Sequence, residues 1–207
     1  MKKMRENEFL STWPQRKYFL LYLGMCIFFL CGIGWGVREA ILLDSQEKEI
    51  VVQEAAKLLN TVRQSYKPET VFIYTSGQLF SIYLLLFLIG LSAIGFPVAF
   101  AVVFSRGVML GFTGAILASQ NPGKGVFLAL AALLPQNIVY LPSLLLAASG
   151  TVVFALKLFK VYFSREKNLG LTFAGYVVLM VFAVAAAYGA AAVEAYLSPK
   201  IILYFLK

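Results

Sequence analysis

The chain has 207 residues, of which 60% are hydrophobic and only 14% are charged. A soluble domain usually carries about 25% charged residues. The mean hydropathy of +0.80 and several long apolar runs therefore indicate a polytopic membrane protein. This length leaves room for about five spans and one modest polar segment, and it excludes a second soluble domain.

The net charge of +8 would also suit a nucleic-acid-binding protein, but the positions of the basic residues favour a different explanation. Lysine and arginine gather in the N-terminal tail and between the last two apolar runs. Cytoplasmic loops of membrane proteins carry an excess of these residues. We therefore expect the N-terminus inside, the C-terminus outside and no nucleic-acid partner.

The first apolar run, residues 18–37, follows a basic tail over residues 1–17 that we expect to be cytoplasmic. A run of this length exceeds the apolar core of a signal peptide, which has about 7–15 residues. No cleavage site of small residues follows it. We interpret the run as a retained transmembrane helix.

A polar segment, residues 38–77, comes next and is expected outside the cytoplasm. Within it, residues 45–64 show an apolar stripe at helical spacing. Asp44 and Glu47 stand at the spacing of a capping box, which marks a helix N-terminus. The sequence predicts an external amphipathic helix that lies on the membrane or a partner, or packs on the chain's own spans.

The next apolar residues divide into a predicted second span over 78–104 and a short segment over 107–119. Pro97 is expected to kink the second span, and Arg106 to mark its cytoplasmic edge. As a helix the short segment measures only about 20 Å, which is less than the membrane thickness. It either crosses or re-enters on the same side, and we favour a crossing.

The run over residues 125–156 would measure about 48 Å as a straight helix, which is too long for one ordinary span. Pro135 and Pro142 interrupt it, and Gln136 and Asn137 add amide groups beside the first proline. Irregular backbone at membrane depth is tolerated only where protein or water surrounds it. We expect these amides to bond the carbonyls freed by the prolines, or a neighbouring helix. The stretch is either a structural kink or a polar contact point for partner helices.

The last predicted span, residues 171–197, is rich in alanine and carries Glu194 near its outer end, where water or headgroups can reach it. With this span, the membrane core covers residues 78–207. The sequence thus predicts an all-α, polytopic integral membrane protein with about five transmembrane helices. One of these helices is short and one is broken by proline.

Two pairs of glycines, Gly32 with Gly36 and Gly107 with Gly111, stand four residues apart. This spacing lets two helix backbones approach closely in a membrane. The glycines pack within one chain or form a surface for a second copy or a partner's span. The sequence pattern leaves both interpretations open.

No constellation of catalytic residues is visible in the sequence. The chain has no histidine, and no acidic residue lies in the middle of a predicted span. We therefore expect no enzymatic activity, no metal and no cofactor. Ion-coupled transporters usually carry charged residues at mid-depth, and the predicted spans lack them. A small-solute channel or transporter subunit stays as the alternative, with Gln136, Asn137 and the glycines lining a narrow pore.

Four stretches, "SAIGFP", "SRGVMLGFTGAIL", "GKGVFLALAALLPQN" and the "LP" after it, occur in this order. They resemble the core of the stage II sporulation protein M family, closely over residues 92–142. The resemblance implies a membrane scaffold that recruits and holds two cell-wall hydrolases, sporulation proteins D and P, through membrane helices. That complex thins septal peptidoglycan at the cytoplasmic membrane during forespore engulfment. Candidate contacts for these partners or for a second copy are Gly32, Gly36, Gly107, Gly111, Pro135, Gln136 and Asn137.

Overall fold

The computed structural model describes residues 15–44, 46–54, 57, 67–92, 95–119, 125–164 and 169–198, and within these ranges the chain is helical without any strand. Five of its helices are long and apolar enough to cross a membrane. The predicted fold class, an all-α polytopic membrane protein, is confirmed. The elements are α2 (Gln15–Leu42), α4 (Pro68–Gly90), α5 (Phe96–Ser119), α6 (Gly125–Ser164), α7 (Leu169–Ala192) and the π-helix η1 (Val193–Leu197).

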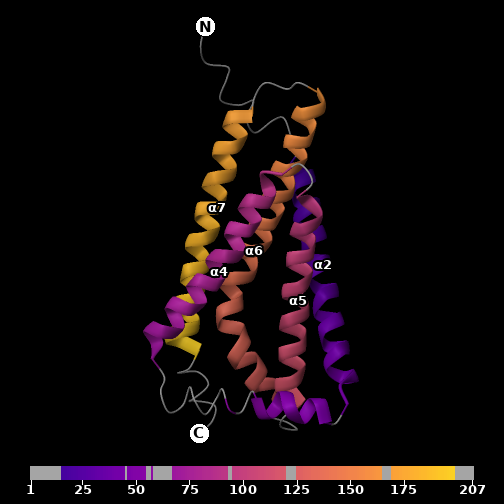
Figure 1. Ribbon diagram of the computed structural model, residues 1–207, viewed down its shortest axis with the longest axis vertical. Coiled ribbons are helices and arrows are strands. Elements are labelled where there is room, and N and C mark those ends of the chain that lie inside the picture. Colours follow the sequence, from indigo (N-terminus) through magenta and orange to yellow (C-terminus); the bar gives the residue numbers. More distant parts are fainter. Residues whose placement is uncertain are drawn as a thin grey trace.

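The five helices form an elongated bundle in which successive helices run in opposite directions (Figure 1). The start of α2 and the end of η1 consequently lie at opposite ends of the bundle. Helix α2 packs along α5, while α6 contacts α2, α4, α5 and α7 and is the most buried of the spans. Helices α4 and α5 diverge from the turn that joins them, and α6 lies between them (Figure 1).

The structure places the boundary between the second and third spans earlier than predicted. Instead of a span over 78–104 and a short segment over 107–119, it shows two full-length helices, α4 with 23 residues and α5 with 24. Pro97 is the second residue of α5 rather than a kink, because a proline in the first helical turn sacrifices no intrahelical hydrogen bond. In the intervening turn, the N–H of Gly95 donates to the carbonyl of Ser92 at 3.0 Å.

The polar segment after α2 begins a helix at the predicted place. Residues 46–54 are helical and lie across the end of the bundle (Figure 1). The N–H of Asp44 donates to Glu47 Oε2 at 3.3 Å, which is one half of the predicted capping box. The C-terminal part of the predicted helix over 45–64, with most of its apolar stripe, lies outside the described residues.

Helix α6 continues through both Pro135 and Pro142, so the predicted break is a bend within one helix. The ribbon of α6 changes direction in the half of the helix that begins at Gly125 (Figure 1). Helix α6 also extends to Ser164, beyond the predicted end of the span. A continuous helix is compatible with these prolines because neighbouring helices can satisfy the freed backbone groups.

The four glycines predicted as partner contacts lie where the backbones of α2 and α5 meet. They are Gly32, Gly36, Gly107 and Gly111, and all four are buried. A Cβ atom on Gly32 would lie only 2.5 Å from the carbonyl oxygen of Phe104. A Cβ atom on any of the other three would overlap a carbonyl oxygen of the facing helix. The glycine spacing therefore serves packing within one chain.

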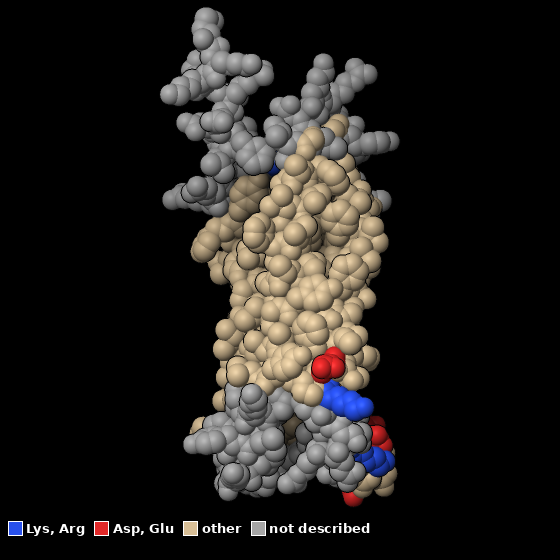
Figure 2. Space-filling view, turned by 90° about the vertical axis from the view of Figure 1, so that its left-hand side faces the viewer, with Lys and Arg blue, Asp and Glu red and all other residues tan. Residues whose placement is uncertain are grey.

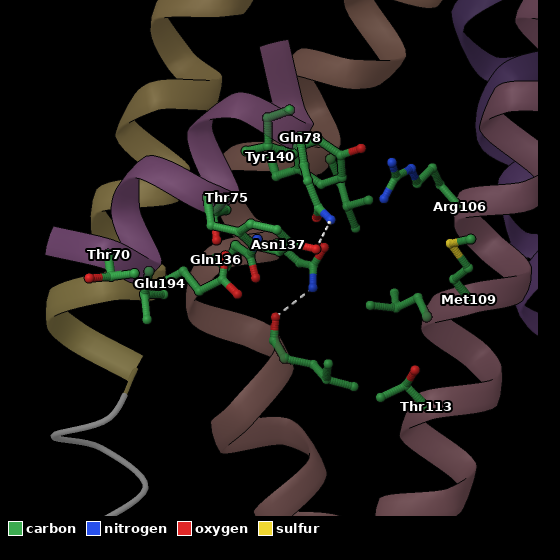
Figure 3. A pocket seen from close by; sticks show the side chains of 16 residues that line it. Thr70, Thr75, Gln78, Arg106, Met109, Thr113, Gln136, Asn137, Tyr140 and Glu194 are labelled. Atoms are coloured by element: carbon green, nitrogen blue, oxygen red, sulfur yellow. Dashed lines mark hydrogen bonds between the residues drawn. The ribbon is translucent and has the colours of Figure 1, made fainter. Parts of the chain in front are cut away.

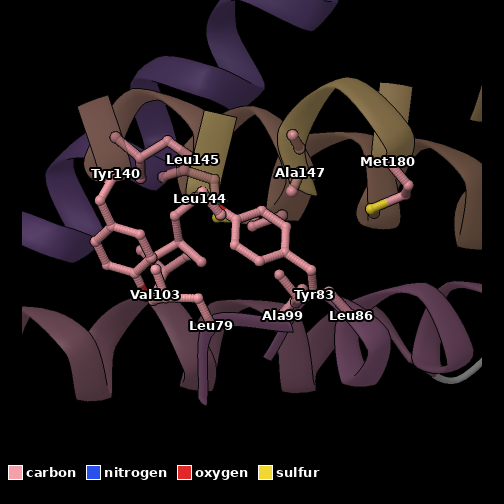
Figure 4. Close-up of a cluster of buried hydrophobic side chains, with 14 of the residues drawn as sticks. Leu79, Tyr83, Leu86, Ala99, Val103, Tyr140, Leu144, Leu145, Ala147 and Met180 are labelled. Atoms are coloured by element: carbon pink, nitrogen blue, oxygen red, sulfur yellow. The ribbon is translucent and has the colours of Figure 1, made fainter. Parts of the chain in front are cut away.

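A core of large side chains joins α4, α5, α6 and α7, as Figure 4 shows for residues such as Tyr83, Val103, Leu144 and Met180. Tyr83 is 1% exposed, and its hydroxyl shares a hydrogen bond of 2.6 Å with Ser143 on α6. Interhelical hydrogen bonds of this kind contribute about 0.6 kcal/mol each in membrane proteins. The bond thus adds a modest polar link to an apolar contact.

A second polar link ties α7 to the end of α4. The hydroxyl of Tyr176 donates to the carbonyl of Leu86 at 3.0 Å and lies 3.2 Å from that of Phe87. The Phe87 carbonyl is among the last four of α4, which lack partners within the helix. The Tyr176 ring also stacks between Phe87 and Phe154, with centroid distances of 5.5 and 4.6 Å.

The middle of the bundle surface is suited to lipid. In Figure 2 most of the charged side chains in view gather near the end of the bundle where α2 finishes, and a broad uncharged belt lies between the ends. The ion pair between Arg38 and Glu39, at 3.2 Å, belongs to the last turns of α2. This distribution supports a membrane position for the belt.

Candidate functional site: a polar cavity among α4, α5, α6 and η1

A cavity of about 520 Å³ lies where α4 and α5 diverge, with α6 behind it and η1 at one side (Figure 3). Sites for small molecules commonly measure about 300–1,000 Å³. Many of the residues that line the cavity carry polar side chains. Its polar side chains are Thr70, Tyr74, Thr75, Gln78, Arg106, Thr113, Gln136, Asn137, Tyr140 and Glu194.

Arg106 is the cation of this cavity and lies well inside the third span. It is the eleventh residue of α5, which places it about 15 Å along the helix axis. The prediction that Arg106 marks a cytoplasmic edge is wrong, because it relied on a span ending at residue 104. Ion pairs among the described residues join Arg38 to Glu39 and Lys57 to Glu54, so the half-buried Arg106 has no carboxylate partner there. A charged residue within a span is costly and commonly marks a functional site.

Tyr140, on α6, presents a buried hydroxyl on the same side of the cavity as Arg106. The residue is 5% exposed, and its hydroxyl has no hydrogen-bond partner. It lies close enough to Arg106 for electrostatic interaction with the guanidinium group. A buried hydroxyl without a partner loses about 1–3 kcal/mol of hydration. The hydroxyl therefore has an unused hydrogen-bond donor close to Arg106, at the wall of the cavity.

Glu194 lies on the side of the cavity opposite to Arg106 (Figure 3). It belongs to the π-helix η1, and π-helical turns occur frequently at functional sites. The Oε2 atom of its carboxyl group is buried and has no hydrogen-bond partner. Although Glu194 is near the end of the span over residues 172–197, as predicted, it is half-buried and lines the cavity.

The amides beside Pro135 also line the cavity, but they do not bond the freed carbonyls. Asn137 Nδ2 donates to the carbonyl of Leu133 at 2.7 Å, one turn back on its own helix. The carbonyl that Pro135 frees belongs to Ala131, so the predicted role of Asn137 is wrong. Gln136 lines the same cavity, and Pro135 does not.

An apolar groove of about 670 Å³ lies among α2, α5 and α6. It shares four lining residues with the polar cavity: Leu110, Leu133, Asn137 and Leu141. The two hollows thus lie side by side along the contact between α5 and α6. A ligand with a polar head and an apolar chain would find both surfaces close together.

Sequence reasoning identified Gln136 and Asn137 but missed Arg106, Tyr140 and Glu194 as parts of one site. The signal for Arg106 is the pair Gly95 and Pro97, which together mark a turn followed by a helix start. A helix that begins there has Arg106 near its middle. Tyr140 and Glu194 carry no comparable signal, because only the tertiary arrangement directs them into one cavity.

Five membrane-length helices, with a polar cavity among α4, α5, α6 and η1, define a polytopic helical membrane protein. The chain matches the model of one family, described as stage II sporulation protein M, over residues 25–199. It therefore belongs to that family, which implies a role in sporulation. No curated protein and no solved structure matches the chain.

Proposed function

We propose that this protein is a non-enzymatic membrane scaffold that recruits and holds septal peptidoglycan hydrolases, the sporulation proteins D and P. In this role it supports thinning of the septal wall and engulfment of the forespore. The observation that carries the proposal is the family match over residues 25–199, which includes almost the whole five-helix bundle. The hydrolytic chemistry resides in the partners, and the scaffold uses no cofactor.

The proposed location is the bacterial cytoplasmic membrane, with the N-terminus inside and the protein concentrated at the sporulation septum. The basic tail over residues 1–17 supports this orientation, because cytoplasmic flanks carry excess lysine and arginine. An odd number of crossings then puts η1 near the outer face. The polar segment after α2 also lies outside, on the side where the wall hydrolases work.

The contact surface for the hydrolases is proposed to lie away from the paired glycines. Gly32 and Gly107 face each other across α2 and α5, so they have no free face for a partner helix. Gln136 and Asn137 line a polar cavity instead. Lipid-facing parts of the bundle and the external segment are the surfaces left for partner spans or for a second copy.

A sporulating host that lacks this protein provides the test. Fluorescently tagged D and P proteins should fail to gather at the septum, and engulfment should stall with a thick septum. Reintroduction of the full chain should restore both. Normal gathering of the two hydrolases in the strain that lacks the chain would refute the scaffold role, because recruitment would then need no contact with it.

A small-solute channel or transporter subunit is the second candidate, and one observation favours it. The argument that no charge lies at membrane depth is wrong, since Arg106 occupies the middle of α5. Proteoliposomes containing the purified chain should take up a solute if this candidate is correct, and Arg106→Gln should abolish the uptake. Intact hydrolase recruitment by an Arg106→Gln variant would instead favour the scaffold role.

A further inference from the structure

The polar cavity has two chemically opposite sides, each with a charged group and an unsatisfied buried atom. On one side stand the Arg106 guanidinium and the Tyr140 hydroxyl, which both can donate hydrogen bonds. On the other stands the Glu194 carboxyl group, whose Oε2 is buried without a partner. Figure 3 shows Arg106 and Glu194 on opposite sides, with Gln78 and Asn137 between them.

The two charges do not neutralise each other directly. Neither ion pair formed among the described residues includes Arg106 or Glu194. Charged side chains within a membrane span usually pair or face water. Two separated charges of opposite sign, on either side of a cavity of ligand size, match a molecule that carries the complementary charges at its own two ends.

We propose that this cavity binds a zwitterionic ligand. Its anionic group, a phosphate or carboxylate, contacts Arg106 and accepts a hydrogen bond from Tyr140. Its ammonium group donates to the unsatisfied oxygen of Glu194. Polar amides at Gln78 and Asn137 line the middle. This inference goes beyond the scaffold role and does not depend on it.

The structure also limits what kind of molecule can fit. A volume of about 520 Å³ suits a headgroup or a short peptide rather than a whole helix. The ligand reaches the cavity either as a free solute or as the headgroup of a zwitterionic phospholipid. The neighbouring apolar groove, which shares Leu110 and Leu141 with the cavity, offers a surface for acyl chains in the second case.

The test uses the full chain purified in detergent and measures binding calorimetrically. Glycerophosphoethanolamine and glycylglycine are the zwitterionic probes, with a phosphate and a carboxylate respectively. Glycerol 3-phosphate and ethanolamine each supply only one of the two charges. If the ligand is a free solute, at least one zwitterion should bind more tightly than both single-charge probes by about tenfold or more, because two charge-assisted contacts form together.

The lipid source is tested in nanodiscs, by mass spectrometry of the lipid that remains bound to the released protein. Discs contain phosphatidylglycerol alone or mixed with phosphatidylethanolamine. Selective retention of phosphatidylethanolamine without binding of either soluble probe identifies the lipid as the source. Binding of a soluble zwitterion without lipid selection identifies a free solute.

Variants of the lining residues test whether the ligand binds in this cavity. Arg106→Gln and Glu194→Gln should each weaken it about tenfold or more, and Tyr140→Phe should weaken it several-fold. Arg38→Gln is the matched control, since Arg38 is exposed and outside the cavity, and it should bind as the unmodified chain does.

Should a charge variant fail to fold, the test rests on Tyr140→Phe and on the single-charge probes. The proposal is overturned if no zwitterion, soluble or lipid, binds selectively, or if binding is insensitive to the cavity variants that fold.

Discussion

Replacement of Gly36 by alanine perturbs the close contact between α2 and α5 with a single methyl group. The added Cβ would overlap the carbonyl oxygen of Val108 and would lie 2.8 Å from the amide nitrogen of Phe112. Both neighbours are backbone atoms, so no side-chain rotation can relieve the clash. The two helices must therefore separate locally.

The expected loss of stability follows from two opposing effects. Insertion of a methyl group into a well-packed contact costs about 1–3 kcal/mol. Alanine in place of glycine within a helix contributes about 0.5–1 kcal/mol in the other direction. Gly36→Ala should thus lower the free energy of unfolding by roughly 1–2 kcal/mol.

Gly34 provides a matched control on the same helix. It is exposed, and an added Cβ would meet nothing within 4 Å. Gly34→Ala should leave the stability unchanged or raise it by about 0.5–1 kcal/mol. Thermal melting of both variants in one detergent gives the comparison. Equal melting temperatures for Gly36→Ala and Gly34→Ala would refute the close backbone contact between α2 and α5.

Tyr176→Phe removes the hydroxyl that bonds the carbonyl of Leu86, and it should lower the free energy of unfolding by about 0.6 kcal/mol, with a maximum near 1.7. Melting of Tyr188→Phe, an exposed position on the same helix, is the control, and equal effects of the two changes would contradict this link. Asn137→Leu should accumulate in the membrane at the normal level, because the lost hydrogen bond lies within α6 and joins no second helix. Loss of folded protein, assayed by size-exclusion chromatography, would show that Asn137 stabilises the bundle in some other way.

The number of spans could be predicted from the sequence because each span is a long apolar run. The boundary between α4 and α5 could not, because the turn between them contains almost no polar residue. Ser92 is its only described polar side chain, and apolar runs continue on both sides. A proline in the first turn of a helix and a proline in a kink also look alike in an apolar sequence.

The glycine pairs illustrate a different limit. Their spacing correctly predicts a close helix contact, yet spacing alone cannot choose between a second helix of the same chain and a partner. The structure resolves this for Gly32 and Gly107, whose Cα atoms face each other across α2 and α5. Because a pair of glycines with this spacing occurs on both α2 and α5, the two pairs considered together favour packing within one chain.

The cavity could be predicted only in part because its lining comes from four separate elements. Gln136 and Asn137 stand out as amides within an apolar run. Glu194 sits near a span end, where an acidic residue is ordinary, and Tyr140 resembles any other aromatic residue of a membrane helix. These two residues line the cavity only because α4 and α5 diverge and leave this side of α6 uncovered.

Copurification from sporulating cells tests the central proposal, the scaffold role, most directly. The tagged full chain is extracted in mild detergent, and D and P proteins in the eluate are quantified against an unrelated five-span membrane protein carrying the same tag. The scaffold account predicts that both hydrolases copurify, and that exchange of their transmembrane segments for foreign ones reduces recovery strongly. Absence of both hydrolases from the eluate of a stably folded chain would contradict the account.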